Sequence, residues 1–369
     1  MFLVRSLNYG GTERQLVALA TTLQHKGESV VVATFYPAGA WRKNLEAARV
    51  PFYSLGKRGR WDFLFVFRLI KLVREIRPAI LYSYLGTANI LTTLLKPLFP
   101  NLRIVWSVRA SNMDLSRYGW LDRFLYRLEC ALSAFADLII ANSHTGLDYA
   151  IAHGFPKEKM VVISNGIDTD EFVPDPDLRK NVRGNLGVRE TDRLIGLVGR
   201  LDPMKGHPTF LKAAALLARE RMDVRFLCVG DGPQSYQSRL RSMSEELGLG
   251  RQVIWLSSAE DMSAIYNAMD VMTSSSAFGE GFSNAIGEAM ACGVPCVVTD
   301  VGDSKRIVGD FGEVVPPADP SALAQAWSRT LKPNANEERR RTQIRTRIME
   351  QYGLQALANR TAAALKDIS

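Results

Sequence analysis

Two glutamates in one short segment have the chemistry to bind the hydroxyls of a neutral ligand. Glu280 and Glu288 are separated by seven residues in Phe278–Asp300, FGEGFSNAIGEAMACGVPCVVTD. An ionised carboxylate only accepts hydrogen bonds, so the pair would repel an anion but would accept from neutral hydroxyls, such as those of a sugar. The alternative is that both are solvated acids near a buried helix end.

The residues between the two glutamates predict a junction between a loop and a helix. Gly281 permits a tight turn, and Ser283 suits the N-cap of a helix that begins at about Asn284. Gly293 and Pro295 end this helix before a strand-like run. The first N–H groups of a helix have no partner within it, and they suit an anion such as a diphosphate.

A second loop, Gly199–Gly206 with the sequence GRLDPMKG, carries two cations. Arg200 and Lys205 lie five positions apart between glycines. A guanidinium fork and an ammonium point charge can together hold a diphosphate. The alternative is a solvated basic loop without a ligand.

Two further turns contain glycine pairs at the ends of strand-like runs. Gly10 and Gly11 lie in NYGGTE, and Gly230 and Gly232 lie in VGDGP. Glycine lets a backbone come close to a ligand, although both pairs are equally compatible with purely structural turns. NYGGTE is not a phosphate-binding Walker loop, because it lacks Gly-Lys-Ser/Thr after four spacer residues.

The order of elements predicts an α/β fold with two doubly wound domains. Strand-like apolar runs alternate with helical segments throughout both halves of the chain, which is typical of parallel sheets covered by helices on both faces. We expect an N-terminal domain over residues 1–166, a linker over 167–192, a C-terminal domain over 193–350, and a final helix over 351–369 that packs back on the N-terminal domain. Such a pair of domains would enclose a ligand-binding cleft.

The composition excludes several classes of protein. The chain has 369 residues, of which 47% are hydrophobic, and no apolar run is long enough to span a membrane. Four cysteines form no disulfide framework, and with four histidines they show no metal-ligand spacing, so we expect buried thiols and no metal. The N-terminus does not resemble a signal peptide, which predicts a cytoplasmic protein.

The positive charge is confined to the first half of the chain. The net charge is +8, and residues 1–166 contain 21 Lys and Arg against 11 Asp and Glu, or +10. This asymmetry indicates an acidic partner: anionic lipid, a phosphorylated substrate or nucleic acid. No nucleic-acid-binding motif is present, so we expect none to be bound.

The landmarks occur in the order GGTE, SNGID (Ser164–Asp168), GRLDPMKG, VGDGP and the Glu-x7-Glu segment that closes on EAMACGVPCVV. In this order they resemble family 4 glycosyltransferases (glycosyl transferases group 1), a large retaining group with the GT-B fold. The resemblance covers nearly the whole chain. The Glu-x7-Glu segment is its most specific part.

The resemblance implies a role for each motif. The C-terminal domain would bind a nucleotide-sugar, with Glu288 on the ribose and Glu280, as a catalytic residue, on the donor sugar. Arg200 and Lys205 would hold the diphosphate and stabilise it as it leaves, without a metal or cofactor. The backbone of Gly281, Phe282, Ser283 and Asn284, with the glycine turns, would complete the donor site. The leaving phosphate would take the acceptor proton, so no protein nucleophile is needed.

Two positions depart from the family pattern. Arg109 stands where many members have a histidine near the acceptor, so the role of that histidine does not carry over. Arg109 stays a candidate on the acceptor side, because its cation could hold a hydroxyl or a phosphate, and the alternative is a purely structural residue. Ser257-Ser258 replaces a more usual glycine in the loop near the base, which leaves the nucleotide open. We expect a UDP-sugar rather than a GDP-sugar.

Lys57–Arg77, KRGRWDFLFVFRLIKLVREIR, combines basic residues with closely spaced aromatic residues. It predicts either an amphipathic helix that contacts the inner face of an anionic membrane, or a helix that faces the core and exposes a basic side. Membrane contact would fit a glycan or lipid-linked acceptor and a role in surface polysaccharide or glycoconjugate biosynthesis.

The alternatives to a transferase are a sugar-nucleotide epimerase or phosphorylase on a similar fold, and a non-catalytic nucleotide-sugar-binding protein. A phosphorylase would need a much longer chain.

Overall fold

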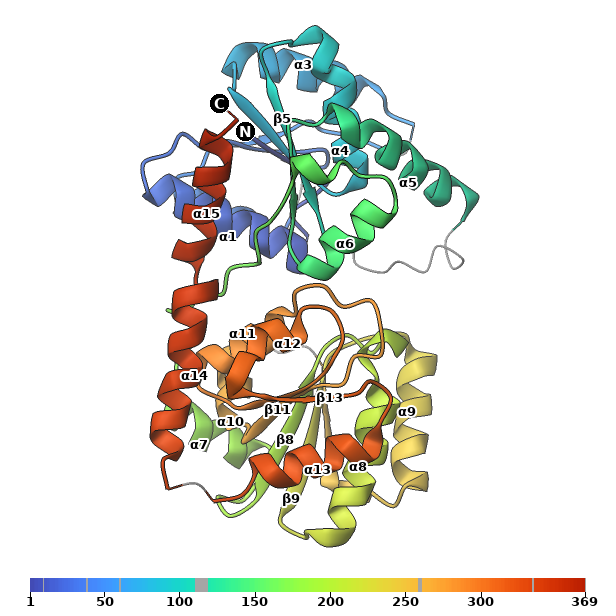
Figure 1. Ribbon diagram of the computed structural model, residues 1–369, viewed down its shortest axis with the longest axis vertical. Helices are drawn as coiled ribbons and strands as arrows, with labels where there is room; N and C mark the ends of the chain where they lie inside the picture. Colours follow the sequence, from blue (N-terminus) through green and yellow to red (C-terminus); the bar gives the residue numbers. More distant parts are fainter. Residues whose placement is uncertain are drawn as a thin grey trace. The chain divides into compact units, whose positions relative to one another are not determined.

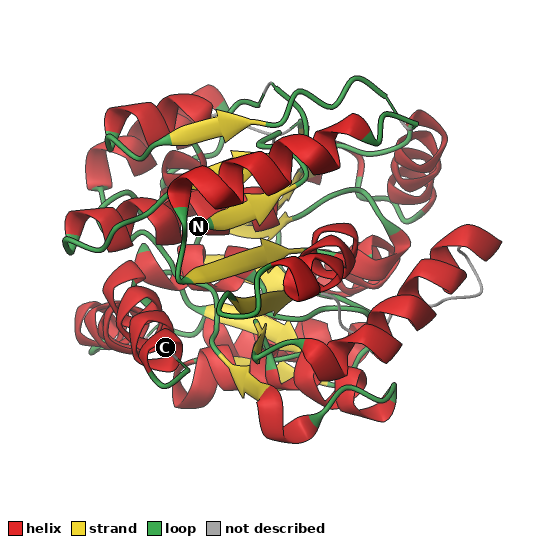
Figure 2. Ribbon diagram, turned by 90° about the horizontal axis from the view of Figure 1, so that it is seen from above, coloured by secondary structure: helices red, strands yellow, loops and turns green. Residues whose placement is uncertain are grey.

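The chain folds into two compact α/β units. The computed structural model describes residues 1–8, 10–37, 39–59, 61–109, 119–257, 261–333 and 335–368. One unit comprises Met1–Gly166 with Leu354–Ser369, and the other comprises Ile167–Gly353. Each contains one parallel sheet with helices on both of its faces (Figures 1 and 2). The predicted fold class of two doubly wound domains is confirmed.

The first unit is built on a seven-stranded sheet in the order β3-β2-β1-β4-β5-β6-β7. Its strands are β1 Phe2–Val4, β2 Val32–Thr34, β3 Phe52–Ser54, β4 Ile80–Tyr84, β5 Arg103–Val108, β6 Leu138–Ala141 and β7 Met160–Val162. Its helices are α1 Gly11–His25, α2 Arg42–Ala47, α3 Leu64–Ile76, α4 Gly86–Leu95, α5 Trp120–Leu132, α6 His144–Ala152 and α15 Leu354–Lys366, with 3-10 turns η1 Lys96–Leu98, η3 Ser133–Phe135 and η4 Lys157–Lys159.

The last helix of the chain belongs to the first unit. α15 packs against α1, and Leu357 and Ala358 are buried in the same core cluster as residues of β1 and α1. Gly166 lies beside this helix: a Cβ at Gly166 would come within 2.8 Å of a methyl of Leu357. Contact with the returning helix therefore requires glycine at the end of the N-terminal segment.

The second unit is built on a six-stranded parallel sheet in the order β10-β9-β8-β11-β12-β13. Its strands are β8 Arg193–Val198, β9 Val224–Val229, β10 Val253–Leu256, β11 Val271–Ser274, β12 Cys296–Thr299 and β13 Glu313–Val315. Its helices are α7 Pro176–Asn185, α8 His207–Glu220, α9 Gln234–Glu246, α10 Met262–Ala268, α11 Asn284–Ala291, α12 Ser304–Val308, α13 Pro320–Thr330 and α14 Glu337–Tyr352, with 3-10 turns η5 Pro203–Lys205, η6 Gly250–Gln252 and η7 Gly309–Phe311.

Residues 167–192, expected as a linker, lie within the second unit and contain α7. Asp175 caps this helix by accepting hydrogen bonds from the backbone of Asp177 and Leu178, both at 2.9 Å. The segment has linker-like composition because α7 is attached by charged side chains more than by an apolar face. Within α7 the only buried residue is Arg183.

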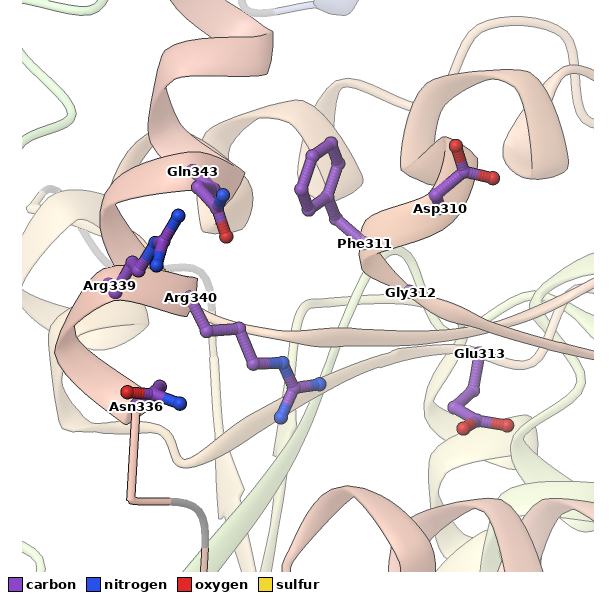
Figure 3. A pocket seen from close by; sticks show the side chains of 8 residues that line it. All are labelled: Asp310, Phe311, Gly312, Glu313, Asn336, Arg339, Arg340 and Gln343. Carbon is purple, nitrogen blue, oxygen red and sulfur yellow. The ribbon is translucent and has the colours of Figure 1, made fainter.

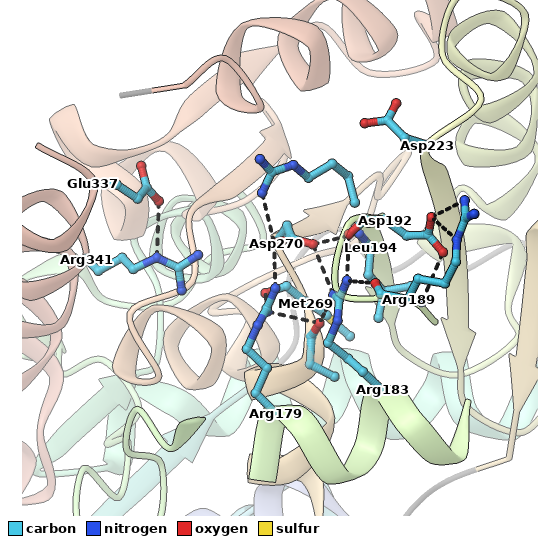
Figure 4. Close-up of polar contacts among 12 residues, drawn as sticks. Arg179, Arg183, Arg189, Asp192, Leu194, Asp223, Met269, Asp270, Glu337 and Arg341 are labelled. Atoms are coloured by element: carbon cyan, nitrogen blue, oxygen red, sulfur yellow. Dashed lines mark hydrogen bonds and ion pairs between the residues drawn. The ribbon is translucent and has the colours of Figure 1, made fainter. Parts of the chain in front are cut away.

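Asp270, between α10 and β11, joins this charged network (Figure 4). Its side chain is 5% exposed and lies 2.8 Å from Arg179 Nη2 and 3.2 Å from Arg183 Nη1. It also accepts a hydrogen bond of 2.8 Å from the backbone N–H of Leu194 in β8. One buried carboxylate thus holds α7 against the sheet.

We predict that Asp270→Asn destabilises the second unit severely. The change keeps the shape of the side chain but leaves the guanidinium of Arg183 buried without its counter-charge, at a cost of about 3 kcal/mol. Glu313→Gln is the matched control, because its ion pair with Arg329 is solvent-accessible and contributes less than about 1 kcal/mol. Chemical denaturation measures both free energies of unfolding. Equal losses of unfolding free energy in the two variants would contradict the role of Asp270 as the buried counter-charge of Arg183.

Candidate active site

Three of the predicted loops meet at one edge of the second sheet. They follow β8, β9 and β11, which are neighbours and parallel, so their carboxyl ends lie together. The strand order reverses at β8, and in open α/β sheets ligands bind at this switch point. The loop after β8 carries Arg200 and Lys205, and the loop after β11 carries Glu280.

Lys205 and Glu280 form an ion pair. Lys205 Nζ lies 2.7 Å from Glu280 Oε2, and Ser276 Oγ donates to the same oxygen at 2.8 Å. Glu280 is 7% exposed. Within the described part of the chain, the hydrogen bonds to its carboxylate all reach Oε2, so Oε1 retains capacity to accept a hydroxyl. The structure thus brings a cation and an anion of the predicted site into contact.

The position of Lys205 is set by the backbone around it. Asp202 caps the turn η5 by accepting from the N–H of Met204 at 2.9 Å. Gly206 has φ of 68°, and Ser275 Oγ donates to the carbonyl oxygen of Lys205 at 2.9 Å. A Cβ at Gly206 would lie 1.9 Å from the carbonyl oxygen of Ser275. Only glycine therefore allows this approach of the two loops.

His207, which begins α8, adds no charge to the site at neutral pH. The ring is fully buried. Burial, together with the nearby charge of Lys205, lowers the pKa of His207 to about 4. The imidazole is therefore neutral beside the lysine, and the charge of this loop comes from its cations.

Arg200 differs from Lys205 in being exposed. It follows β8 directly, and its guanidinium makes no hydrogen bond or ion pair to any residue that the structure describes. A charged fork at the sheet edge without a protein partner can reach a bound anion at little cost, because it breaks no existing bond.

Gly230 and Gly232 allow packing between protein loops. A Cβ at Gly230, where φ is 143°, would lie 2.1 Å from the carbonyl oxygen of Gly199, and a Cβ at Gly232 would lie 2.4 Å from that of Leu201. The N–H of Leu201 also donates to the carbonyl of Asp231 at 2.9 Å. The sequence suggested close approach to a ligand, whereas the structure shows close approach to the loop that carries Arg200.

The turn before α11 is made differently from the predicted one. The left-handed glycine is Gly279, with φ of 72°, and Gly281 is not among the glycines of positive φ in the described chain. The carbonyl of Gly281 instead accepts from the N–H of Asp303 at 3.1 Å. Gly302 allows this contact, since a Cβ there would lie 2.3 Å from the carbonyl oxygen of Glu280.

α11 begins at Asn284, as the sequence predicts. Ser283 occupies the N-cap position, but its side chain accepts no capping hydrogen bond. The ring of Phe282 is buried and packs against Tyr352, with centroids 5.3 Å apart. The Phe282 side chain therefore belongs to the core, and what it can offer a ligand is its backbone.

Glu288 lies in α11 and is 4% exposed. Its Oε2 accepts a hydrogen bond of 2.8 Å from the hydroxyl of Tyr266, a fully buried residue of α10. Tyr266, Ser275 and Ser276 are site residues that the sequence analysis missed. The serine run after β11 was a visible signal, but nothing in the sequence links Tyr266 to a glutamate 22 positions away.

The first unit carries the remaining predicted residues. Gly10 is the N-cap of α1 in extended conformation, with φ of −176°, and Gly11 is the first residue of that helix. Tyr9 of the same motif, Ala110 and Ser111 after Arg109, and Ser258 lie outside the described residues. Extended backbone is open to any residue, so the conformation of Gly10 does not itself require glycine.

Arg109 is held in place by three side chains. Its guanidinium group donates to Ser107 Oγ at 2.8 Å, to the hydroxyl of Tyr84 at 3.3 Å, and to Asn165 Oδ1. It also lies over the ring of Tyr84, 5.0 Å from the centroid. Arg109 therefore links β5 to Asn165 of the SNGID motif, which gives it a structural role in the first unit.

A small cavity of about 160 Å³ adjoins Arg109 and is lined also by Tyr126 and Glu129. Burial raises the pKa of Glu129.

A larger pocket of about 480 Å³ lies in the second unit (Figure 3). One of its sides is formed by η7 and β13, and the other by the start of α14. It is lined by none of the predicted site residues.

The described residues include no group of three or more His, Cys, Asp and Glu side chains that could hold a metal ion. Cys228, Cys292 and Cys296 are buried as expected, whereas Cys130 is only partly buried. Burial raises the pKa of the Cys228 and Cys292 thiols to about 12, so at neutral pH they are poor nucleophiles. This is the environment expected of small apolar core residues.

Comparison with known proteins places both units in one family. Residues 9–171 match the model described as Glycosyltransferase Family 4, and residues 192–333 match the one described as Glycosyl transferases group 1. The chain is 34% identical over 207 residues to a D-inositol 3-phosphate glycosyltransferase of Corynebacterium urealyticum, covering 53% of this chain and 49% of the relative. It is 31% identical over 202 residues to a GDP-mannose-dependent alpha-(1-6)-phosphatidylinositol monomannoside mannosyltransferase of Mycolicibacterium smegmatis, covering 52% of each. The chain thus spans about half the length of the curated relatives it matches.

Solved structures share the whole fold. Anabaena HepE in complex with UDP superposes with a TM-score of 0.86 at 23% identity, covering 99% of both chains. Sucrose-phosphate synthase from Thermosynechococcus elongatus gives a TM-score of 0.81 at 19% identity, covering 100% of this chain and 98% of the other. At this identity the likeness shows the fold.

We predict that Gly206→Ala destabilises the protein more than Gly187→Ala. Both glycines have φ near 67°, but a Cβ at Gly187 would meet no atom within 4 Å, whereas one at Gly206 would overlap the Ser275 carbonyl. Gly187→Ala should cost only the backbone strain of about 1 kcal/mol. Thermal denaturation compares the two. Similar melting temperatures would show that the loops after β8 and β11 need not approach so closely.

Proposed function

Since the chain belongs to glycosyltransferase family 4, we propose that it is a retaining glycosyltransferase that moves a sugar from a nucleotide-sugar to a hydroxyl of an acceptor. The observation that supports this most is the Lys205–Glu280 ion pair beside the exposed Arg200 at the switch point of the second sheet. It provides cations for a diphosphate and a carboxylate for sugar hydroxyls at one place. Glycosyltransferase is also the function in the names of the curated relatives.

In this proposal each residue binds a different part of the donor. Arg200 and Lys205 bind the diphosphate, and Oε1 of Glu280 accepts a hydrogen bond from a sugar hydroxyl. Glu288, supported by Tyr266, accepts from the ribose hydroxyls. The backbone N–H groups at the start of α11, in Gly281–Asn284, complete the phosphate site.

The reaction breaks the bond between the anomeric carbon and the β-phosphate oxygen and forms a bond to the acceptor oxygen on the same face of the sugar. The acceptor proton passes to the departing phosphate oxygen. Negative charge develops on the leaving diphosphate, where Arg200 and Lys205 stabilise it more strongly than in the ground state. This mechanism uses neither a metal ion nor a protein nucleophile.

For the donor we propose a UDP-sugar. Support comes from the structural neighbour HepE, which was solved with UDP and with UDP-glucose. The GDP-mannose-dependent relative makes GDP-mannose the competing donor. Thermal shift with UDP, GDP, ADP and their sugar conjugates, with and without EDTA, distinguishes them, because a ligand of the folded state raises the melting temperature. A shift by GDP alone would contradict a UDP-sugar donor, and a shift abolished by EDTA would contradict metal independence.

For the acceptor we propose a glycan or lipid-linked saccharide at the inner face of a membrane, in glycoconjugate or surface polysaccharide synthesis. The excess of ten positive charges in residues 1–166 supports contact with anionic lipid. A phosphatidylinositol mannoside is the acceptor in the name of one relative. In the described residues no helix has the length and apolarity needed to cross a bilayer.

We predict that Arg200→Ala and Lys205→Ala each lower kcat by roughly 100-fold, because each removes a charge that stabilises the leaving diphosphate. Lys212→Ala is the control, since this exposed lysine of α8 lies outside the site and should leave kcat unchanged. The measurement is release of nucleotide during sugar transfer. Near-normal turnover in both site variants would refute the diphosphate assignment. Nucleotide binding without any turnover by the intact chain would favour a non-catalytic binding protein.

We predict that Tyr266→Phe weakens nucleotide binding by roughly tenfold while the fold is kept, because Glu288 loses a hydrogen bond that orients its carboxylate. Tyr236→Phe makes the same chemical change in the same unit. The Tyr236 hydroxyl is buried without a partner among the described residues, so affinity should not change. Calorimetric titration with nucleotide measures both. Unchanged affinity in Tyr266→Phe would show that Glu288 does not depend on Tyr266.

A further inference from the structure

Four large apolar side chains are exposed at the N-terminal end of α3. Trp61, Phe63, Leu64 and Phe67 are 77%, 63%, 67% and 68% exposed. We call these four residues the α3 patch. Soluble surfaces rarely gather so much apolar area in seven positions without a partner.

The opposite face of α3 already has a partner. Its buried residues are Phe65, Leu69, Leu72 and Val73, which belong to one of the cores of the first unit. The helix is therefore fully docked, and the patch is additional to what the core needs. Of the aromatic residues clustered in the sequence, only Phe65 serves the core, which corrects the interpretation of this segment as a helix that exposes only a basic side.

Asp62 holds the patch in its exposed position. Its carboxylate accepts from the N–H groups of Arg58 at 2.9 Å and Leu64 at 3.0 Å, and it pairs with Arg68 at 3.3 Å. Because Asp62 is bound on the protein side, its neighbours Trp61 and Phe63 are presented outward, with ring centroids 6.4 Å apart. The hydrogen bonds to Asp62 also lower its pKa and keep it paired, so its charge is compensated locally.

Basic residues continue the same outward face. Lys71, with a side chain 78% exposed, and Arg74 follow Leu64 and Phe67 at helical spacing, so they lie on one side of α3. The whole segment Lys57–Arg77 contains seven Lys and Arg against two Asp and Glu, a net charge of +5. Exposed Trp, Phe and Leu residues beside Lys and Arg are typical of segments that lie in a lipid headgroup layer, and the ion pair of Lys71 with Glu75 is exposed to solvent.

We propose that the α3 patch inserts into the interfacial layer of an anionic bilayer, with the exposed Arg58, Lys71 and Arg74 at the lipid phosphates. Charge favours this partner over a second copy of the chain, because two α3 patches would bring two segments of charge +5 together. The inference rests on the proposed function in one respect only: docking on a membrane would bring the enzyme close to the lipid-linked acceptor proposed above.

Vesicle flotation tests the proposal with the full chain. We expect binding to vesicles with about 30% phosphatidylglycerol, weak binding to pure phosphatidylcholine, and release by salt. Trp61→Ser/Phe63→Ser/Phe67→Ser should lower the affinity for anionic vesicles roughly tenfold or more. Trp120→Ser is the matched control, because Trp120 on α5 is 79% exposed and should not be needed.

Insertion has its own readout in the intact protein. Brominated lipids should quench the tryptophan fluorescence that comes from Trp61, which is the part of the signal that is lost in Trp61→Phe. This test does not depend on whether the triple variant folds. The UDP-induced thermal shift should be unchanged in the α3 variants, so failure here is distinguishable from failure of the proposed transferase. No binding of the wild type to anionic vesicles, an equal loss in Trp120→Ser, or a dimer dissolved by the α3 changes would each overturn the proposal.

Discussion

The candidate site depends on backbone-to-backbone contact between loops at the carboxyl edge of the second sheet. A Cβ at Gly206, Gly230, Gly232 or Gly302 would lie between 1.9 and 2.4 Å from a carbonyl oxygen of a neighbouring loop. No side chain fits in such a space, so four glycines determine how closely the loops after adjacent strands approach. The positions of Lys205 and Glu280 follow from that approach, since each lies next to one of these contacts. Glycines that look like ligand-binding turns thus act first through the protein's own packing.

The charges of the site are arranged by the same geometry. The ion pair between Lys205 and Glu280 balances one cation with one anion, while Arg200 stays exposed. Neutral His207 leaves that balance unaltered at ordinary pH. A ligand with an anionic half and a hydroxyl-bearing half meets complementary groups here: the cations of Arg200 and Lys205 for the anion, and the carboxylate of Glu280 for the hydroxyls. This arrangement suits a nucleotide-sugar better than a simple phosphate.

The first unit uses polar anchors for a different purpose. Gln15 of α1 both donates to the carbonyl of Gly166 and accepts from its N–H, each at 2.8 Å, while Asn165 holds Arg109. Asp62 anchors the start of α3 in the same manner. In each case a buried or half-buried polar side chain fixes the conformation of a loop through hydrogen bonds. The residues next to it are then available for contacts at the surface or with a ligand.

The sequence by itself determined the fold class and the family and predicted the loops of the candidate site, because alternating apolar runs and short motifs such as GRLDPMKG depend on neighbours along the chain. It also placed the start of α11 at Asn284. It did not determine that α7 belongs to the second unit, because its attachment through Asp270 joins residues about 90 positions apart. Nor did it identify Tyr266 as the partner of Glu288, the loop contacts of Gly230 and Gly232, or the exposure of Trp61 and Phe67. Those features are decided by which surfaces meet when the strands align, and local patterns carry no information about contacts between distant segments.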